Sequence, residues 1–449
     1  MVEGNSTSGP SIAVVGGGMT GIAAACELAR HGACSVTLFE QAERLGGLSS
    51  SFTWRDVTWD RFYHVILSTD APLLGFIDEL GLTNQLFWRD TKVGFYGDGR
   101  LVSLSSSWDF LTFPFMSPWQ KVRLGLGILR SARIKDPARL DKIYVREWLT
   151  QMFGRRVYER IWDPLLRSKL GAARERTSAA FIWATINRLY GARGESSTKR
   201  EKMGHVRGGY ETILTAAARA LSRKRVNILC GAPVRTVRTQ ADRAGGLTLQ
   251  AGDDTFTFDK VILTTPCPET VKITGADVTA PYWKALSDVE YLSIACVVLI
   301  LNKSLSPYYV TNLIDETLPF TGVIEATNIV DPEYLGGRHL VYLPKYMPAE
   351  DEVNQWDDGK VINTFVTALK RMHPQLQDAD ILHTRLFRER FVQPVQEVNF
   401  LQRKTGFRSP MNGVYVVNTS MIYNSTLNNN AAVALGRDCA REALADLEL

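Results

Sequence analysis

The sequence predicts a mixed α/β protein in which a parallel βαβ unit at the N-terminus is followed by a second, mixed sheet. Two observations predict this class. A short β-branched run, SIAVV, leads into a glycine-rich turn, a helix-forming segment and a second strand, SVTLFE. The second half of the chain contains apolar runs such as SIACVVLIL and HLVYLP, which are typical of strands. With 449 residues, 45% of them hydrophobic, the chain is long enough to bury several packed layers.

The glycine-rich turn has the spacing of a dinucleotide-binding motif. Gly16 allows a tight turn, Gly18 lets the backbone approach a pyrophosphate, and Gly21 lets the helix pack closely on the strand. The free N–H groups and positive dipole end of the helix then face the phosphates. Glu40 ends the second strand, where a carboxylate accepts hydrogen bonds from a ribose. A lone GxGxxG also fits an ordinary loop, but its place between strand and helix favours a Rossmann-like domain.

The next residues, Gln41 to Gly47 (QAERLGG), indicate which dinucleotide-binding family the motif resembles. With Glu40 they form E-x-x-x-R-x-G-G, which resembles the flavin-containing amine oxidase and protoporphyrinogen oxidase superfamily. Three further stretches are similar to that superfamily: GGY with the following VNILCGAPVRTVR, FDKVILTTP, and the C-terminal GVYVVNTSMIYNSTLNNNAAVALGRDCAREAL. The resemblance implies FAD as cofactor, bound by a Rossmann-like domain of the glutathione reductase type that the C-terminal segment completes.

The resemblance also implies which residues bind FAD. They belong to the glycine turn, the ribose strand, the glycine pair, the adenine segment and the C-terminal helix start: Gly16, Gly18, Met19, Thr20, Gly21, Glu40, Gln41, Arg44, Gly46, Gly47, Leu48, Val234, Thr265, Asn418, Asn428 and Asn429. No cysteine or histidine in the terminal segment matches the family's covalent attachment pattern, so noncovalent binding is expected.

The motifs predict a discontinuous FAD-binding domain made of residues 1–69, 204–284 and 405–449. Residues 70–203 are mostly helical by pattern and are expected to form a substrate region that is open to a membrane-facing role. Residues 285–404 contain the apolar runs and are expected to form a mixed-sheet substrate domain.

Flavin performs the electron chemistry itself, so the protein has to place a substrate against the ring. In the galactopyranose mutase branch of the superfamily, a stretch similar to DRFYH brings a histidine beside the flavin, which makes His64 the first catalytic candidate. Glu325 and Tyr346 are the other two, from probable strand ends that also carry Tyr342 and Lys345. A structural role remains open for each of them. Two basic stretches are candidates for holding a phosphate group: Arg167 and Lys169, and Arg385, Arg388 and Arg390.

Two departures from the amine oxidase pattern bear on the reaction. Ala295 stands where amine oxidases place a lysine, and Asn418 stands where many have an acidic residue. We therefore expect an FAD-dependent oxidoreductase that transfers a hydride between a small-molecule substrate and noncovalently bound flavin. The alternatives are a redox-neutral isomerase resembling UDP-galactopyranose mutase and a noncatalytic FAD-binding scaffold.

Composition narrows the choice of partners. The net charge is only +5, with Lys and Arg spread along the chain, so a nucleic-acid partner is not expected. The six cysteines show no CxxC pair and no metal-type grouping with histidines, which is typical of reduced thiols in a cytosol. The start, MVEGNSTSGPS, lacks the pattern of a signal peptide. Nothing in the pattern defines an oligomeric state.

One segment, from Trp108 to Lys135, joins clustered aromatics to a basic helical stretch. It is open to two interpretations. It is either a peripheral membrane contact or a helix packed on the core with its arginines in water.

Overall fold

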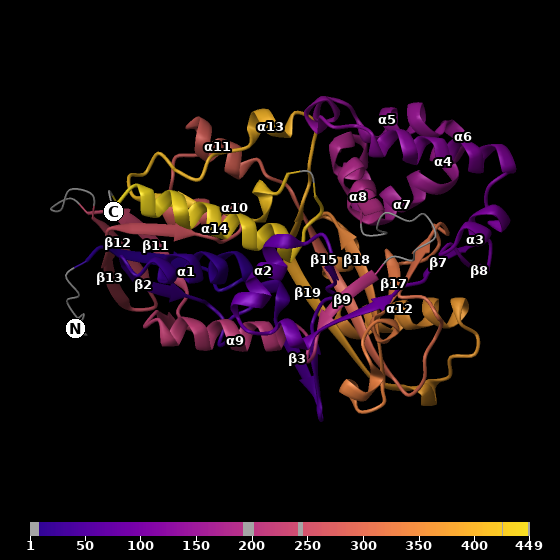
Figure 1. The fold of residues 1–449 in the computed structure, drawn as a ribbon, viewed down its shortest axis with the longest axis horizontal. Helices are drawn as coiled ribbons and strands as arrows, with labels where there is room; N and C mark the ends of the chain where they lie inside the picture. Colours follow the sequence, from indigo (N-terminus) through magenta and orange to yellow (C-terminus); the bar gives the residue numbers. More distant parts are fainter. Residues whose placement is uncertain (1–8, 192–201, 241–245, 424, 448–449) are drawn as a thin grey trace.

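A computed structural model of the chain describes residues 9–191, 202–240, 246–423 and 425–447, and it divides them between two lobes (Figure 1). The first lobe is built on a five-stranded sheet, parallel throughout, with strands from all parts of the chain. In spatial order these strands are β10 (Asn227–Leu229), β2 (Ser35–Phe39), β1 (Ser11–Val15), β14 (Lys260–Leu263) and β20 (Val414–Val416). In chain order this is 3-2-1-4-5, the order of a Rossmann-like sheet.

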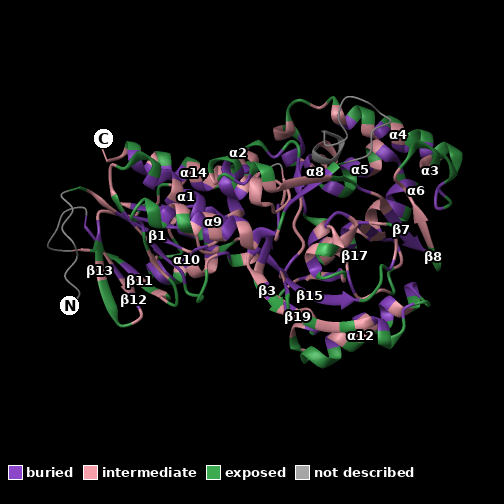
Figure 2. Ribbon diagram, turned by 60° about the horizontal axis from the view of Figure 1, so that its bottom comes forward, coloured by how far each residue is buried: buried purple, intermediate pink, exposed green. Residues whose placement is uncertain are grey.

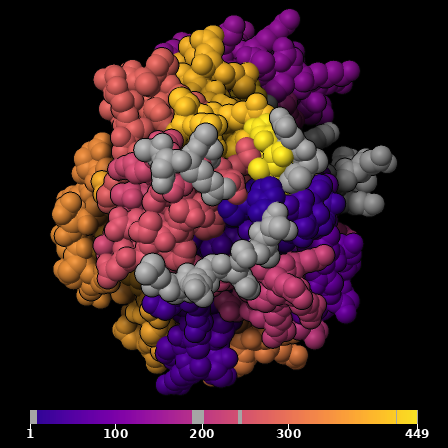
Figure 3. Space-filling view, turned by 90° about the vertical axis from the view of Figure 1, so that its left-hand side faces the viewer, coloured from indigo at the N-terminus to yellow at the C-terminus, as the bar shows by residue number. Residues whose placement is uncertain are grey.

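Three helices pack together on this sheet: α1 (Met19–His31), α9 (Tyr210–Arg223) and α14 (Asn429–Ala445). Helix α1 lies between the other two (Figure 1). A separate antiparallel sheet, β11 (Val234–Thr239), β12 (Leu247–Ala251) and β13 (Asp254–Phe258), inserts between β10 and β14 and shares the same apolar core. The C-terminal end of α14 lies beside the N-terminal segment at this end of the molecule (Figure 3). The predicted Rossmann-like fold is therefore confirmed, including the C-terminal return.

The second lobe is built on a seven-stranded mixed sheet, in which only the β16–β7 pair is parallel. Its strands in spatial order are β19 (Ile381–Pro394), β15 (Tyr291–Leu301), β18 (His339–Met347), β17 (Gly322–Glu325), β16 (Val310–Leu313), β7 (Val93–Gly97) and β8 (Arg100–Ser103). Strand β15 is buried along its whole length because both of its faces are covered. Helix α12 (Asp358–Met372) covers one face.

Two small sheets connect the lobes. The hairpin of β3 (Ser51–Trp54) and β4 (Val57–Asp60) follows the second glycine pair. The other sheet has the order β5 (Ile66–Leu67), β9 (Lys202–Val206) and β6 (Leu86–Asp90). The chain also forms the short helices α10 (Cys267–Thr274), α11 (Pro281–Ser287) and α13 (Phe400–Arg403).

The stretch predicted as mostly helical differs from that prediction at its start. It contains the strands β6, β7 and β8, because β6 pairs with β9 and the VGFYG segment, β7, pairs with β16 and β8. The remainder forms a helical layer at one end of the second lobe (Figure 1). Its helices are α3 (Ser107–Thr112), α4 (Pro118–Ala132), α5 (Val145–Phe153), α6 (Arg155–Val157), α7 (Asp163–Leu170) and α8 (Ala179–Gly191), while α2 (Ala71–Glu79) lies against α14 in the first lobe.

Candidate active site

The glycine turn between β1 and α1 leaves the start of the helix open. Gly16 has a φ of 108°, and a Cβ on Gly21 would lie 1.9 Å from the Gly16 carbonyl oxygen, so both positions require glycine. Gly18 is the N-cap; no described side chain caps it, and a Cβ there would meet no described atom within 4 Å. The first N–H groups of α1 therefore face open space, as an anion-binding helix end requires.

Glu40 is held at the end of β2 by two backbone donors. Its Oε2 accepts a hydrogen bond from Gly17 N at 2.6 Å, and its Oε1 accepts one from Ala42 N at 2.8 Å. The carboxylate is buried. Each oxygen has a second lone pair, so Glu40 is oriented by the turn and still able to accept a ribose hydroxyl.

The second glycine pair lies directly on the first turn. Gly46 N donates to Gly17 O at 2.8 Å, and a Cβ on Gly47 would lie 3.2 Å from Gly18 Cα. The predicted cofactor residues Gln41 and Arg44 flank this contact with exposed side chains. The two glycine motifs, separate in sequence, therefore form one continuous strip of backbone.

Buried donors without partners mark where a polar ligand fits this strip. Arg61 donates through Nη2 to Gly47 O at 3.1 Å, while its Nε is buried with no described partner. Asn429 accepts a hydrogen bond from Ser49 Oγ at 3.1 Å, and its Nδ2 is likewise buried and unpartnered. Orphaned donors of this kind are costly unless a ligand satisfies them, so the residues present fit a polar cofactor.

The remaining predicted cofactor residues are placed as follows. Met19, Thr20 and Gly21 form the buried first turn of α1, Leu48 packs under the hairpin, and Val234 begins β11 half-buried. Asn428 is the N-cap of α14: its side chain accepts from Ala431 N at 2.8 Å.

Two of the predicted cofactor residues have their side chains engaged elsewhere. Asn418 Nδ2 donates to Thr265 O at 2.9 Å, and Asn418 Oδ1 accepts from Ser420 N at 3.0 Å. The hydroxyl of Thr265 bonds that of Thr270 at 2.8 Å. The bond from Asn418 to Thr265 O joins the segments that follow β14 and β20, and the Thr265 hydroxyl bonds within its own segment.

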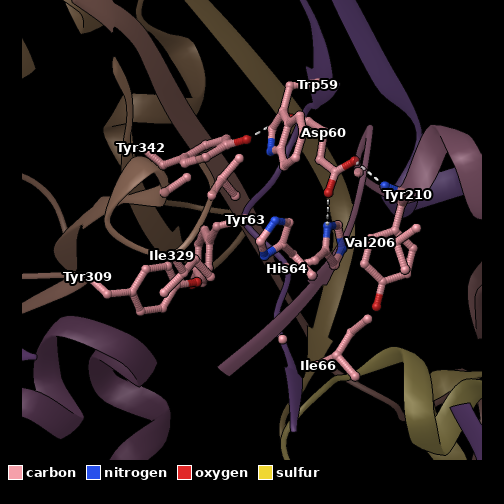
Figure 4. A pocket seen from close by; sticks show the side chains of 15 residues that line it. Trp59, Asp60, Tyr63, His64, Ile66, Val206, Tyr210, Tyr309, Ile329 and Tyr342 are labelled. Carbon is pink, nitrogen blue, oxygen red and sulfur yellow. Dashed lines mark hydrogen bonds and ion pairs between the residues drawn. The ribbon is translucent and has the colours of Figure 1, made fainter. Parts of the chain in front are cut away.

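A pocket lined largely by aromatic side chains adjoins the strip. Its lining comes from the segment after β4, from β9, from the start of α9 and from the second lobe (Figure 4). The described lining residues are Trp59, Asp60, Tyr63, His64, Ile66, Gly204, His205, Val206, Gly209, Tyr210, Tyr309, Ala326, Ile329, Val330 and Tyr342. The segment Asp60–His64 thus has Arg61 on the glycine strip and its neighbours in the pocket.

Asp60 organises this pocket. Its Oδ1 accepts from Tyr210 N at 2.9 Å, and its carbonyl accepts from the Tyr342 hydroxyl at 2.7 Å (Figure 4). His64 Nδ1 lies 3.7 Å from Asp60 Oδ2, at ion-pair distance. Burial raises the pKa of the Asp60 carboxyl, and the neighbouring His64 opposes that rise. The predicted candidate His64 therefore lies in a pocket, beside a buried carboxyl group.

Sequence reasoning missed His205. It lies on β9, is 6% exposed, and neither ring nitrogen has a described partner. Burial, helped by the charge of Arg89, lowers its pKa to about 4, so the ring is neutral at physiological pH. The signal was a histidine three residues before the GG of the adenine segment, but only pairing of β9 with β5 and β6 brings it to the pocket.

Tyr346 joins the site through a second aromatic contact. Its hydroxyl hydrogen bonds to that of Tyr63 at 3.0 Å, and the Nζ of Lys169 lies 6.0 Å from its ring centre. Burial raises the pKa of Tyr346 to about 12. The predicted basic residue Lys169 therefore faces inward from α7, whereas Arg167 pairs with Asp163 and Glu316 at the surface.

Glu325 has a different environment from that expected of a catalytic residue. Its carboxylate is buried and accepts hydrogen bonds from Ser304 Oγ at 2.5 Å, Leu305 N at 3.0 Å and Ser306 N at 3.0 Å. It does not line the pocket. The structure thus assigns Glu325 to holding the loop before β16. Lys345 likewise pairs with Asp351 at 3.2 Å.

Strand β15 contains Ala295, the residue that stands where amine oxidases place a lysine. Ala295 faces helix α12, because side chains alternate along β15 and it belongs to that side. Ile294 and Cys296 face the cluster that contains Tyr63 and Tyr342. None of the three is basic, so neither face offers a lysine there. Arg388 of the paired strand β19 donates to the carbonyls of Val353 and Trp356.

The parallel sheet, glycine strip and adjoining pocket define a dinucleotide-binding enzyme of the flavoprotein class. The chain belongs to the family of flavin containing amine oxidoreductases, whose pattern it matches over residues 19–444. Its cofactor is FAD, and it is an FAD-dependent oxidoreductase.

Individual relatives agree with this family. The chain is 22% identical to protoporphyrinogen oxidase 2 of Arabidopsis thaliana over 50% of each chain, so it spans half the length of that relative. It is 27% identical to protoporphyrinogen oxidase of Bos taurus over 64% of this chain and 66% of the other. Its fold is similar to that of a provisionally named protoporphyrinogen oxidase from Exiguobacterium sp. 255-15, with a TM-score of 0.77, 17% identity and coverage of 99% and 100%.

Proposed function

We propose that the protein oxidises an uncharged, largely apolar substrate by hydride transfer to noncovalently bound FAD. The observation that carries this proposal is the segment Asp60–His64. Arg61 of that segment binds the glycine strip, while Asp60, Tyr63 and His64 line the aromatic pocket. A substrate in the pocket is therefore next to the cofactor strip.

The charge of the pocket favours a neutral substrate over an alkylammonium ion. Asp60 is the only acidic residue among the described lining residues, and it is engaged by Tyr210 N and His64. Lys169, near Tyr346, adds a positive charge on the adjoining side. A cationic amine would thus bind without an available carboxylate, which is unfavourable in a buried site. Of the activities named for its relatives, protoporphyrinogen oxidation involves no alkylammonium substrate, so it agrees better with this pocket than putrescine oxidation does.

The residues have separate roles in this proposal. Bound FAD supplies the two-electron acceptor that takes a hydride from a substrate carbon. His64, beside Asp60, takes the proton that leaves with it. His205 offers one donor and one acceptor to a polar group of the substrate, because the neutral ring has both. The aromatic lining excludes water from the reacting atoms. An external oxidant, dioxygen or an added dye, reoxidises the cofactor.

An anaerobic titration tests the proposal. The FAD-loaded protein is mixed with a neutral reduced tetrapyrrole, a polyprenyl alcohol or a diamine, and the loss of flavin absorbance is followed. A neutral substrate should bleach the flavin, and His64→Gln should slow the bleaching about 100-fold, the usual scale of a lost general base. His31→Gln, an exposed histidine of α1, is the matched control.

Three results would contradict the proposal. Bleaching by the diamine alone would reverse the substrate class. Turnover that requires reduced flavin and consumes no oxidant would indicate the isomerase alternative. Flavin that stays with the acid-precipitated protein would show covalent attachment.

A further inference from the structure

The helical layer carries an unusual concentration of exposed apolar side chains. Of the ten large hydrophobic side chains that are exposed in the described part of the chain, six lie between residues 108 and 129. Trp119 is 74% exposed and Trp108 71% exposed, and the other four are between 46% and 64% exposed: Leu111, Val122, Leu126 and Leu129. We call these six residues the apolar face. Figure 2 shows α3 and α4 at the edge of the second lobe farthest from the nucleotide-binding lobe.

The apolar face is a regular feature of helix α4. Trp119, Val122, Leu126 and Leu129 recur at helical spacing and form one stripe along its outer side. The opposite side is buried: Gly127 packs against Phe153, where a Cβ would lie 2.4 Å from the ring. The inner side packs on the protein through Leu124, which is 6% exposed, together with Lys121, Gly127 and Ser131. The helix therefore carries large apolar residues on its solvent side as well as on its packed side, which is unusual for a surface helix.

The two helices present this face as a fixed unit. Ser117 and Gln120 form a capping box that defines the start of α4. Lys121 Nζ donates to Leu111 O at 2.5 Å, which ties α3 to α4. Trp183 of α8 donates through Nε1 to Ser131 O at 3.0 Å and ties α4 to the layer beneath. The apolar face is therefore preformed and not dependent on a partner for its folding.

The charge around the face identifies the partner. Residues 105–135 contain five Lys or Arg and one acidic residue, Asp109, which accepts hydrogen bonds from Ser103 Oγ and Ser105 N. Arg123, Arg130 and Arg133 are exposed, and none forms an ion pair with another described residue. Apolar residues with tryptophans, flanked by arginines that have no ion-pair partner among the described residues, suit the interface of an anionic bilayer.

From these observations we propose that α3 and α4 dock the protein on the surface of a membrane that contains anionic lipid. The apolar face enters the boundary between headgroups and acyl chains, and the arginines bind lipid phosphates. The contact lies on one leaflet, since α4 has 15 residues and about 20 are needed to span a bilayer. None of the helices among the described residues is both long and apolar enough to cross one. The proposal is independent of the substrate.

Vesicle flotation of the FAD-loaded protein tests the proposal. At low salt, the protein should float with phosphatidylcholine vesicles containing about three-tenths phosphatidylglycerol, and less with phosphatidylcholine alone. Replacing Trp119 and Leu126 by serine should lower the partition coefficient more than about tenfold. Replacing Arg130 and Arg133 by glutamine should lower it about tenfold for the anionic vesicles only.

Controls separate this contact from general stickiness. Leu382 and Leu401 are 41% and 40% exposed and lie outside the apolar face, so their replacement by serine should leave flotation unchanged. All variants should retain bound FAD. The proposal is overturned if the wild-type protein stays with the lipid-free fraction, or if the apolar-face variant floats equally well. It is also overturned if sedimentation shows a dimer that this variant dissociates, since a second copy would then cover the face.

Discussion

Helices α1 and α14, which flank the FAD strip, approach each other closely at Gly436, and this makes Gly436→Ala a sharp test of the fold. A Cβ at this position would lie 2.2 Å from the carbonyl oxygen of Thr20 and 3.2 Å from the amide nitrogen of Ala24. An ordinary carbon contact needs about 3.5 Å. Helix α14 would therefore have to move away from α1 by roughly 1 Å.

The expected change in the free energy of unfolding is the difference between two opposing effects. Alanine is preferred to glycine in a helix interior by about 1 kcal/mol, which favours the variant. Overpacking of a rigid contact costs about 1 to 3 kcal/mol, and here the contact atoms are backbone and cannot rotate away. At Gly75 in α2 an added Cβ meets no described atom within 4 Å, so only the favourable term applies. Gly436→Ala should thus destabilise the protein by up to about 2 kcal/mol, and Gly75→Ala should stabilise it by about 0.5 to 1 kcal/mol.

Urea unfolding of both variants, followed by tryptophan fluorescence with and without FAD, measures these effects. Movement of α14 also displaces Asn429 from Ser49, so Gly436→Ala should weaken FAD binding as well. If Gly436→Ala proves as stable as Gly75→Ala and binds FAD equally, the close packing of α14 on α1 is refuted.

Three further substitutions test the site. Glu40→Gln leaves one of two buried N–H groups without an acceptor, which costs about 1 to 3 kcal/mol. FAD titration should therefore show at least tenfold weaker binding. The control is Glu43→Gln, since Glu43 is exposed. For His205, burial lowers the pKa from 6.5 to about 4, so between these pH values the unfolded chain takes up a proton that the folded chain does not. The free energy of unfolding should therefore fall by up to about 3 kcal/mol as the pH drops through this window. His205→Gln should make that loss smaller. Tyr346→Phe removes one partner of the partly buried pair with Tyr63, so it should lower the free energy of unfolding by about 1 kcal/mol while leaving FAD binding unchanged. An equal loss of FAD would place Tyr346 in the cofactor strip instead.

The FAD half of the molecule was predictable because its constraints are local. Gly16 and Gly21 are required by a φ angle and by a close backbone approach within one turn, and Glu40 is positioned by Gly17 two dozen residues away. Such requirements appear in the sequence as fixed spacings. The predicted FAD contacts of Thr265 and Asn418 stay predictions, and both side chains bind neighbouring protein groups. A spacing does not specify side-chain direction.

The substrate half was less predictable because its pocket is assembled by topology. His205 and Tyr309 come from strands or loops more than 100 residues apart, and neither belongs to a motif. Glu325 illustrates the converse case. A polar residue at a strand end fits a catalytic role by pattern, but the carboxylate of Glu325 accepts hydrogen bonds from the loop that contains Ser304 and Ser306. Only the spatial arrangement distinguishes a buried carboxylate that serves a loop from one that serves a pocket.

The segment after β4 explains how the cofactor strip and the substrate pocket are held at a fixed distance from each other. Asp60 fixes the start of α9 through Tyr210 N and is itself fixed by Tyr342 of the second lobe. The next residue, Arg61, bonds to Gly47 and to Glu389 of β19, so adjacent residues join both lobes to the glycine strip. Movement of one lobe relative to the other would break these bonds before it changed the pocket lining. The pocket therefore keeps its distance from the cofactor through short polar contacts, and the aromatic lining is free to determine which substrate enters.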